Sequence, residues 1–154
     1  LVLIIILNIY PTFSQENASE GTRFLVSFPQ NERTNSSDFD NNVKLALYIS
    51  SSIGATITLK NHFNNKTVTR TINKDEILTL DNFELGSQNE IEETSDGQIS
   101  RKVIEITSNN PISVFVINSK NNTSDSYLAY PVSEWGNNYI HNSKYTLHML
   151  ETYC

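Results

Sequence analysis

The sequence predicts an all-β fold, an antiparallel β-sandwich of roughly eight to ten short strands. From residue 20 onward, apolar and polar residues alternate along several runs, which is the pattern of strands with one buried face. Polar turn residues separate these runs, and no stretch shows a convincing helical period. A chain of 154 residues that is 38% hydrophobic can bury one core without a metal or disulfides. A β-barrel is the alternative architecture.

The N-terminal segment has the composition of a secretory signal peptide. Leu1–Ile9 is an apolar run much shorter than the roughly 20 residues that a membrane-spanning helix needs. Pro11 follows this run, and Thr12 and Ser14 are small residues at the spacing of a cleavage site. We therefore assign residues 1–15 to a signal peptide remnant and residues 20–154 to the folded domain. A buried N-terminal strand is the alternative interpretation of the same run.

Three runs in the first part of the domain alternate with a period of two: Thr22–Phe28, Val43–Ser50 and Ile53–Lys60. The polar step Ser51-Ser52 between the last two favours a hairpin. The residues expected to face the core are Phe24, Val26 and Phe28, then Val43, Leu45, Leu47 and Ile49, and then Ile53, Ala55, Ile57 and Leu59.

The middle of the chain predicts two further strands, Lys66–Ile72 and Glu76–Leu80, separated by the turn residues 73–75. Thr67, Thr69 and Thr71 would form one β-branched face. The next segment, residues 81–98, carries six acidic residues and no Lys or Arg, so we expect a solvated loop. A cation-binding site is the more specific alternative, but a loop of this kind does not hold its carboxylates in position for a metal ion.

The last two expected strands are Arg101–Ser108 and Ile112–Asn118. Pro111 stands before the second, at a position where a strand tolerates the missing N–H group. Both faces of Ile112–Asn118 are largely apolar, which predicts a central strand that is covered on both sides.

Motifs for catalysis and metal binding are missing. There is no G-x-S-x-G turn near the three histidines, His62, His141 and His148, and there is no phosphate-binding loop. His141 and His148 are seven residues apart, which would put them on opposite faces of a strand rather than around a zinc ion. We therefore predict no catalytic residue, no cofactor and no metal ligand. The net charge of -6 argues against a nucleic acid partner and against an anionic membrane surface.

Two groups of residues are candidate surface sites. Aromatic residues gather in the last third of the chain, where they can anchor a partner or pack at the rim of the sandwich. We predict partner contact by Tyr127, Tyr130, Trp135 and Tyr139, with the loop 119–126 beside them. Sequons for N-glycosylation occur at Asn17, Asn35, Asn65, Asn121 and Asn122, all in expected loops, termini or turns.

Two segments carry the most specific motifs. The first is GTRFLVSFP at residues 21–29, followed by Asn31. The second comprises Ile106-Thr107-Ser108, Pro111-Ile112-Ser113-Val114, Ser124-Asp125, Leu128-Ala129, Pro131-Val132-Ser133, Gly136 and Tyr139. Together they resemble the N-terminal domain of the IgGFc-binding protein family over residues 20–140. Tyr130 stands where the family pattern has Leu, and the segment 81–98 is unusually acidic.

The resemblance implies a secreted, non-enzymatic adhesion or recognition module that binds an extracellular protein or glycoprotein. The resemblance implies immunoglobulin Fc or a mucin-like glycoprotein as a possible partner. It also implies that the domain itself does not insert into a membrane. The alternative is a structural spacer in a larger extracellular or cell-surface protein. Because the chain lacks an initial Met and ends at its single cysteine, Cys154, we expect a fragment truncated at the C-terminus. Cys154 would pair with a cysteine outside this sequence or be incidental.

Overall fold

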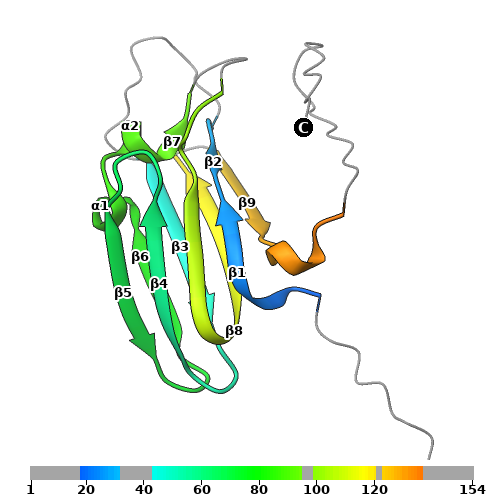
Figure 1. Ribbon diagram of the computed structural model, residues 1–154. Helices are drawn as coiled ribbons and strands as arrows, with labels where there is room; N and C mark the ends of the chain where they lie inside the picture. Colours follow the sequence, from blue (N-terminus) through cyan, green and yellow to red (C-terminus); the bar gives the residue numbers. More distant parts are fainter. Residues whose placement is uncertain (1–17, 32–42, 95–98, 121–122, 137–154) are drawn as a thin grey trace, which may run out of the picture.

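The all-β prediction is confirmed. The computed structural model describes residues 18–31, 43–94, 99–120 and 123–136, and these form nine strands and three one-turn helices (Figure 1). The predicted signal peptide remnant lies outside the described residues. The strands are β1 (Glu20–Val26), β2 (Phe28–Pro29), β3 (Lys44–Ser50), β4 (Ala55–Asn61), β5 (Thr67–Ile72), β6 (Ile77–Asp81), β7 (Glu92–Glu93), β8 (Ile104–Ser119) and β9 (Ser124–Leu128). The helices are α1 (Asn82–Leu85), α2 (Gln88–Ile91) and the 3-10 helix η1 (Val132–Glu134).

Seven of the strands form one curled antiparallel sheet that is organised around β8. Its order is β5-β4-β8-β3-β6, and both β1 and β9 also pair with β8. Residues 104–108 of β8 pair with β4, and residues 104–107 and 112–113 pair with β1. Residues 113–119 pair with β3, and residues 115–119 pair with β9. We call β5-β4-β8-β1 the β4 half and β6-β3-β8-β9 the β3 half; Figure 1 shows them lying over one another. β2 and β7 form a separate two-stranded parallel sheet.

The expectation of two separate strands at 101–108 and 112–118 is wrong, because β8 is continuous. The change of partners takes place at a bulge. Arg23 pairs with Thr107 and Gly21 with Ile112, so residues 108–111 of β8 stand opposite Thr22 alone. Pro111 lies inside this bulge, where its missing N–H group costs no ladder hydrogen bond. One antiparallel sheet therefore curls through this bent strand, so that its two halves face each other (Figure 1).

The expected hairpin between β3 and β4 is also wrong. These strands do not pair with each other, since β3 lies beside β6 and β8 while β4 lies beside β5 and β8. Their connection crosses from one half to the other, and the buried Ser51 holds it by donating a hydrogen bond to the Pro111 carbonyl at 2.9 Å. Ile53 belongs to this connection and is 62% exposed, so it does not join the core. The hairpin in this region joins β4 to β5.

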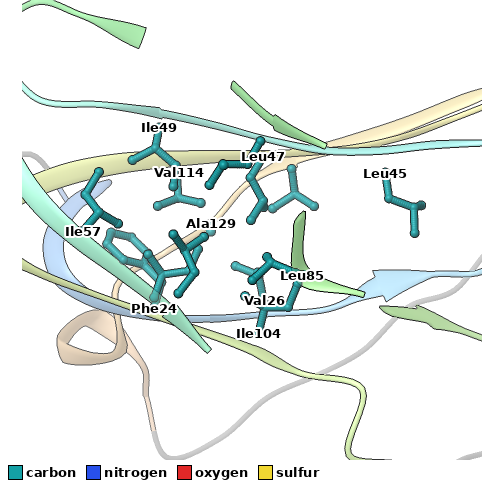
Figure 2. Packing of buried hydrophobic residues seen from close by; sticks show 14 of the residues in the cluster. Phe24, Val26, Leu45, Leu47, Ile49, Ile57, Leu85, Ile104, Val114 and Ala129 are labelled. Carbon is teal, nitrogen blue, oxygen red and sulfur yellow. The ribbon is translucent and has the colours of Figure 1, made fainter. Parts of the chain in front are cut away.

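One apolar cluster fills the space between the two halves (Figure 2). Every other expected core residue is buried, which confirms the register inferred from the alternation. Burying each large apolar side chain contributes about 1.5–3 kcal/mol to the stability of the folded state. The cluster comprises Phe24, Val26 and Phe28; Val43, Leu45, Leu47 and Ile49; Ala55, Ile57 and Leu59; Ile72, Leu80, Leu85 and Ile91; and Ile104, Ile106, Ile112, Val114, Val116 and Ala129.

The acidic segment 81–98 is not simply a solvated loop, and this expectation is corrected. Its described part forms α1, α2 and β7 and buries Leu85, Ile91 and Glu92. Glu90 accepts hydrogen bonds from the Ser87 backbone N–H at 2.7 Å and from its hydroxyl at 2.9 Å, as in a capping box. The Ser87 backbone N–H, first of several donors, holds the pKa of Glu90 below its ordinary value.

A buried polar cluster holds β2 against the end of β8. The Asn118 amide donates to the Pro29 carbonyl at 2.7 Å, and the Asn31 amide donates to the Asn118 carbonyl at 3.1 Å. The buried Glu92 carboxylate accepts hydrogen bonds from the Asn31 backbone N–H and from the Asn118 amide, both at 3.3 Å. These bonds fix the position of the chain where it leaves the sheet.

Candidate binding surface

The outer face of the β3 half carries an apolar row. Tyr48 pairs with Phe115, and Phe115 pairs with Leu128, so the three side chains stand side by side across β3, β8 and β9. Phe115 is 38% exposed and Leu128 is 42% exposed. The expectation that the central strand is covered on both faces is therefore wrong for its outer face. The alternation that buries Val114 and Val116 turns Phe115 outward.

A shallow groove of about 250 Å³ lies along this row. Ile77 of the edge strand β6 borders it and is 65% exposed, while Ser50 and Ser113 contribute its polar lining. Lys44 stands beside Tyr48, with its ammonium nitrogen 5.9 Å from the ring centre and 3.4 Å from the hydroxyl. The groove thus combines apolar walls with hydroxyl groups and carries a cation next to it.

Two of the predicted contact residues are exposed near the end of the described chain. Tyr130 is 58% exposed and Trp135 is 43% exposed, on either side of η1. The Trp135 indole N–H donates to the Tyr130 carbonyl at 3.2 Å, which fixes the ring. Pro131 anchors this segment to the sheet, because it packs directly on Gly21. A Cβ atom at Gly21 would lie 2.4 Å from the Pro131 Cβ atom.

Tyr127 has an internal role as well. Its hydroxyl donates to the Ser27 carbonyl at 2.6 Å and accepts from the Ser27 backbone N–H at 3.2 Å. Although 38% of the residue is exposed, burial raises the pKa of the Tyr127 hydroxyl above its ordinary value of 10.0. Since Ser27 follows β1, these bonds connect the edges of the two halves. The Tyr127 ring, rather than its hydroxyl, is what remains for a partner.

Of the other predicted site residues, Asn65 is the only one that the described part of the chain includes. It lies in the β4–β5 hairpin and is exposed. Asn17, Asn35, Asn121, Asn122 and Tyr139 lie outside the described residues.

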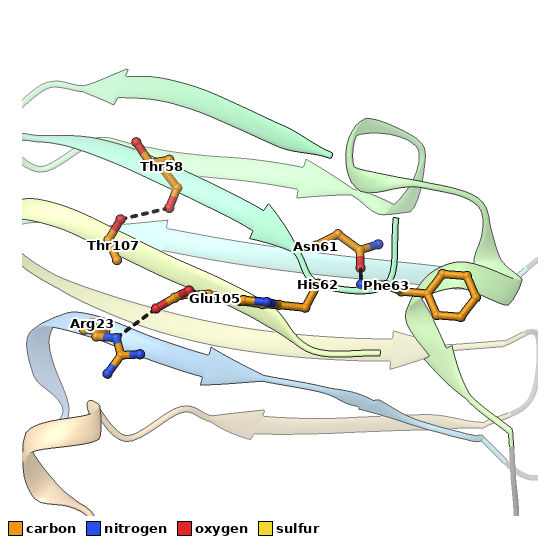
Figure 3. A network of polar contacts seen from close by, with 7 residues as sticks. All are labelled: Arg23, Thr58, Asn61, His62, Phe63, Glu105 and Thr107. Atoms are coloured by element: carbon orange, nitrogen blue, oxygen red, sulfur yellow. Dashed lines mark hydrogen bonds and ion pairs between the residues drawn. The ribbon is translucent and has the colours of Figure 1, made fainter. Parts of the chain in front are cut away.

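The outer face of the β4 half is polar (Figure 3). The hydroxyl oxygens of Thr56 and Thr71 are 3.3 Å apart, as are those of Thr58 and Thr69. Beside these pairs, one charge network crosses three segments of chain. The Glu105 carboxylate accepts from Arg23 Nε at 2.9 Å and contacts His62 Nε2 at 3.0 Å. The hydrogen bond from Arg23, followed by that from His62, holds the pKa of Glu105 below its ordinary value.

His62 faces a carboxylate that already pairs with an arginine, so its described contacts offer no nucleophile for it to activate. The described residues contain no group of three or more His, Cys, Asp or Glu side chains placed to hold a metal ion. None of the helices in the described part has the length and apolar character to cross a bilayer.

Sequence reasoning missed Tyr48, Ile77, Phe115 and Leu128 as members of one surface. The available signal was the apolar character of both faces of residues 112–117. Finding the groove also required the pairing of β8 with β3 and β9, which the local pattern does not specify.

Comparison of the chain with protein-family models, with curated proteins and with solved structures gives no match.

Proposed function

We propose that this protein is an extracellular, non-enzymatic binding module that recognises a protein or glycoprotein through the outer face of its β3 half. The observation that carries the proposal is the exposed apolar row Tyr48, Phe115 and Leu128 beside the groove. Contiguous apolar surface of this kind marks interaction sites, because leaving it in water is unfavourable.

The shape of the groove favours a macromolecular partner. At about 250 Å³ and with an open mouth, it is smaller than the roughly 300–1,000 Å³ typical of small-molecule pockets. It can receive one or two side chains of a partner whose remaining contacts spread over the sheet and the Tyr130–Trp135 segment. A net charge of -6 disfavours a nucleic acid partner.

The family resemblance supports the same proposal. The two segments that carry the resemblance begin at residues 21 and 106, far apart in the sequence. They lie together in the fold because most residues of β1 pair with β8. Several motif residues have packing roles: Gly21 accommodates Pro131, and Asn31 holds Asn118. The motifs therefore describe one coherent structural unit. We infer a module of the IgGFc-binding protein N-terminal type, with immunoglobulin Fc or mucin-like glycoproteins as the first partners to test.

The test measures binding of the full chain to immobilised Fc fragment, a purified secreted mucin and an array of extracellular glycoproteins. Phe115→Glu places a charge in the groove and should weaken binding by about tenfold or more, the effect expected at a central contact. Thr69→Glu puts the same charge on the polar face and should leave affinity unchanged. Equal weakening by both variants would contradict the assignment of the surface. Absence of binding to every probe would favour the spacer alternative.

A further inference from the structure

The β4–β5 hairpin presents an exposed aromatic ring on a hydrogen-bonded turn. Phe63 is 50% exposed, and Figure 3 shows its ring extending from the end of the hairpin. The position is separate from the groove, because the hairpin packs against α1 and α2 rather than against β9. A single exposed aromatic side chain is ordinary on a protein surface, so what matters here is the group that stands beside Phe63 on the turn.

Two buried or half-buried asparagines fix this turn. The Asn61 side chain accepts the Phe63 backbone N–H at 2.8 Å and donates to the Leu85 carbonyl at 3.1 Å. Asn64 repeats this arrangement: it accepts the Lys66 backbone N–H at 2.8 Å and donates to the same Leu85 carbonyl at 3.1 Å. Both amides are therefore occupied by the fold, and the turn is held against α1.

Asn65 differs from its neighbour Asn64. It is exposed, and its φ of 60° lies in the left-handed region, which asparagine tolerates better than most residues. It begins the sequon Asn65-Lys66-Thr67, whose threonine is the first residue of β5. Phe63 stands two positions before it, on the other side of Asn64. The turn thus combines an accessible acceptor asparagine with an exposed ring in a tight loop.

We propose that Asn65 carries an N-linked glycan whose first sugar packs on the Phe63 ring. The inference rests on the export that the proposed function requires. A pyranose has one face formed by C–H groups, and placing that face on an aromatic ring removes apolar surface of both from water. The fixed turn reduces the conformational entropy that ordering the sugar would otherwise cost. The glycan therefore stabilises the hairpin and covers Phe63.

The modification is a group transfer from a lipid-diphosphate-linked oligosaccharide. The side-chain nitrogen of Asn65 forms a bond to the anomeric carbon of the first sugar and loses one proton. The anomeric C–O bond breaks, and the lipid diphosphate leaves with the electron pair. The Thr67 hydroxyl completes the acceptor motif, so Thr67→Ser retains the site and Thr67→Ala removes it.

The experiment uses the full chain in which the other sequon asparagines, Asn17, Asn35, Asn121 and Asn122, are replaced by glutamine. It is produced both through a eukaryotic secretory pathway and in a bacterial cytoplasm, and site occupancy is read by mass spectrometry. The secreted glycan is then trimmed to a single sugar, and thermal unfolding of the two forms is compared. We expect occupancy at Asn65 and a melting temperature about 2–4 °C higher for the glycosylated form, a shift of the size expected from one favourable contact.

Phe63→Ala separates the two parts of the proposal. It keeps the sequon, so Asn65 should still be occupied, but the stabilisation by the sugar should fall by at least half. Occupancy without any stabilisation, or a stabilisation that Phe63→Ala leaves unchanged, would overturn the packing of the sugar on the ring. An unoccupied Asn65 in folded, secreted protein would overturn the modification itself. That result would leave the binding proposal intact, since the groove variants test it independently.

Discussion

The two outer faces of this curled sheet differ although they share a strand. Residues 104–108 of β8 contribute Glu105 and Thr107 to the polar face of the β4 half. Residues 112–119 of the same strand contribute Phe115 to the apolar row of the β3 half. The inner side of β8 buries Ile104, Ile106, Ile112, Val114 and Val116, and it ends at the buried Asn118.

This difference separates the requirements of folding from those of binding. Both halves need an apolar inner face, so the inner residues carry no information about function. A polar outer face is what a solvated sheet ordinarily has, and the threonine pairs and the Glu105 network meet that expectation. The exposed Phe115 has no such structural role on the outer face, and for that reason we place the binding surface there.

The sharpest test of this contrast uses two adjacent residues. Val114 is fully buried and Phe115 points outward, so the same new carboxylate should lower the free energy of unfolding by very different amounts at the two positions. Val114→Asp places an unpaired charge in the core and should cost several kcal/mol, enough to unfold a domain stabilised by about 5–15 kcal/mol. Phe115→Asp should cost about 1 kcal/mol or less. Urea unfolding followed by circular dichroism measures both, and equal losses would contradict the assigned faces.

A smaller effect is expected where the two halves meet. Tyr127→Phe removes the hydroxyl that bridges to both backbone groups of Ser27. Each lost hydrogen bond contributes about 0.5–1.5 kcal/mol, so the free energy of unfolding should fall by about 1–3 kcal/mol. Hydrogen exchange should also become faster in residues 20–29. A variant as stable as the parent, with unchanged exchange, would show that this bridge does not hold the halves together.

The smallest effect is expected on the polar face. Glu105→Gln removes the charge that pairs with Arg23 and His62 at a partly exposed site, which should cost less than about 1 kcal/mol. Because the folded-state pKa of Glu105 lies below its ordinary value of 4.5, the carboxylate stabilises the fold above that pH. This contribution is lost as the pH falls through the lower folded-state pKa. The stability difference between parent and variant should therefore shrink in acid; a constant difference from pH 7 to pH 2 would exclude the network as its source.

The alternation of apolar residues predicted the inner faces of the strands well, because burial of one face imposes a period of two on the sequence. The apolar character of both faces of residues 112–118 predicted their central place in the sheet, although the outer face proved to be exposed at Phe115. The pattern could not distinguish a hairpin from a crossing connection at Ser51-Ser52, since both use short polar turns. Which strands pair depends on distant residues, here on how β8 bends at its bulge.

The candidate surface was only partly visible in the sequence. Tyr130 and Trp135 were expected from the gathering of aromatic residues, and both are exposed. The groove depends on the register between β3, β8 and β9, which brings Tyr48, Phe115 and Leu128 together from separate parts of the chain. The helices α1 and α2 were missed because each is a single turn, too short for a helical period to develop. The motif Ser87-Gln88-Asn89-Glu90 was the one local sign of α2.

Hydrogen exchange of the full chain, with and without saturating Fc fragment or mucin, tests the binding assignment most directly. We expect slower exchange in β3, in residues 112–119 of β8 and in β9 when a partner is bound, with β4 and β5 unchanged. Protection centred on β4 and β5, or no protection with any extracellular glycoprotein, would contradict this assignment.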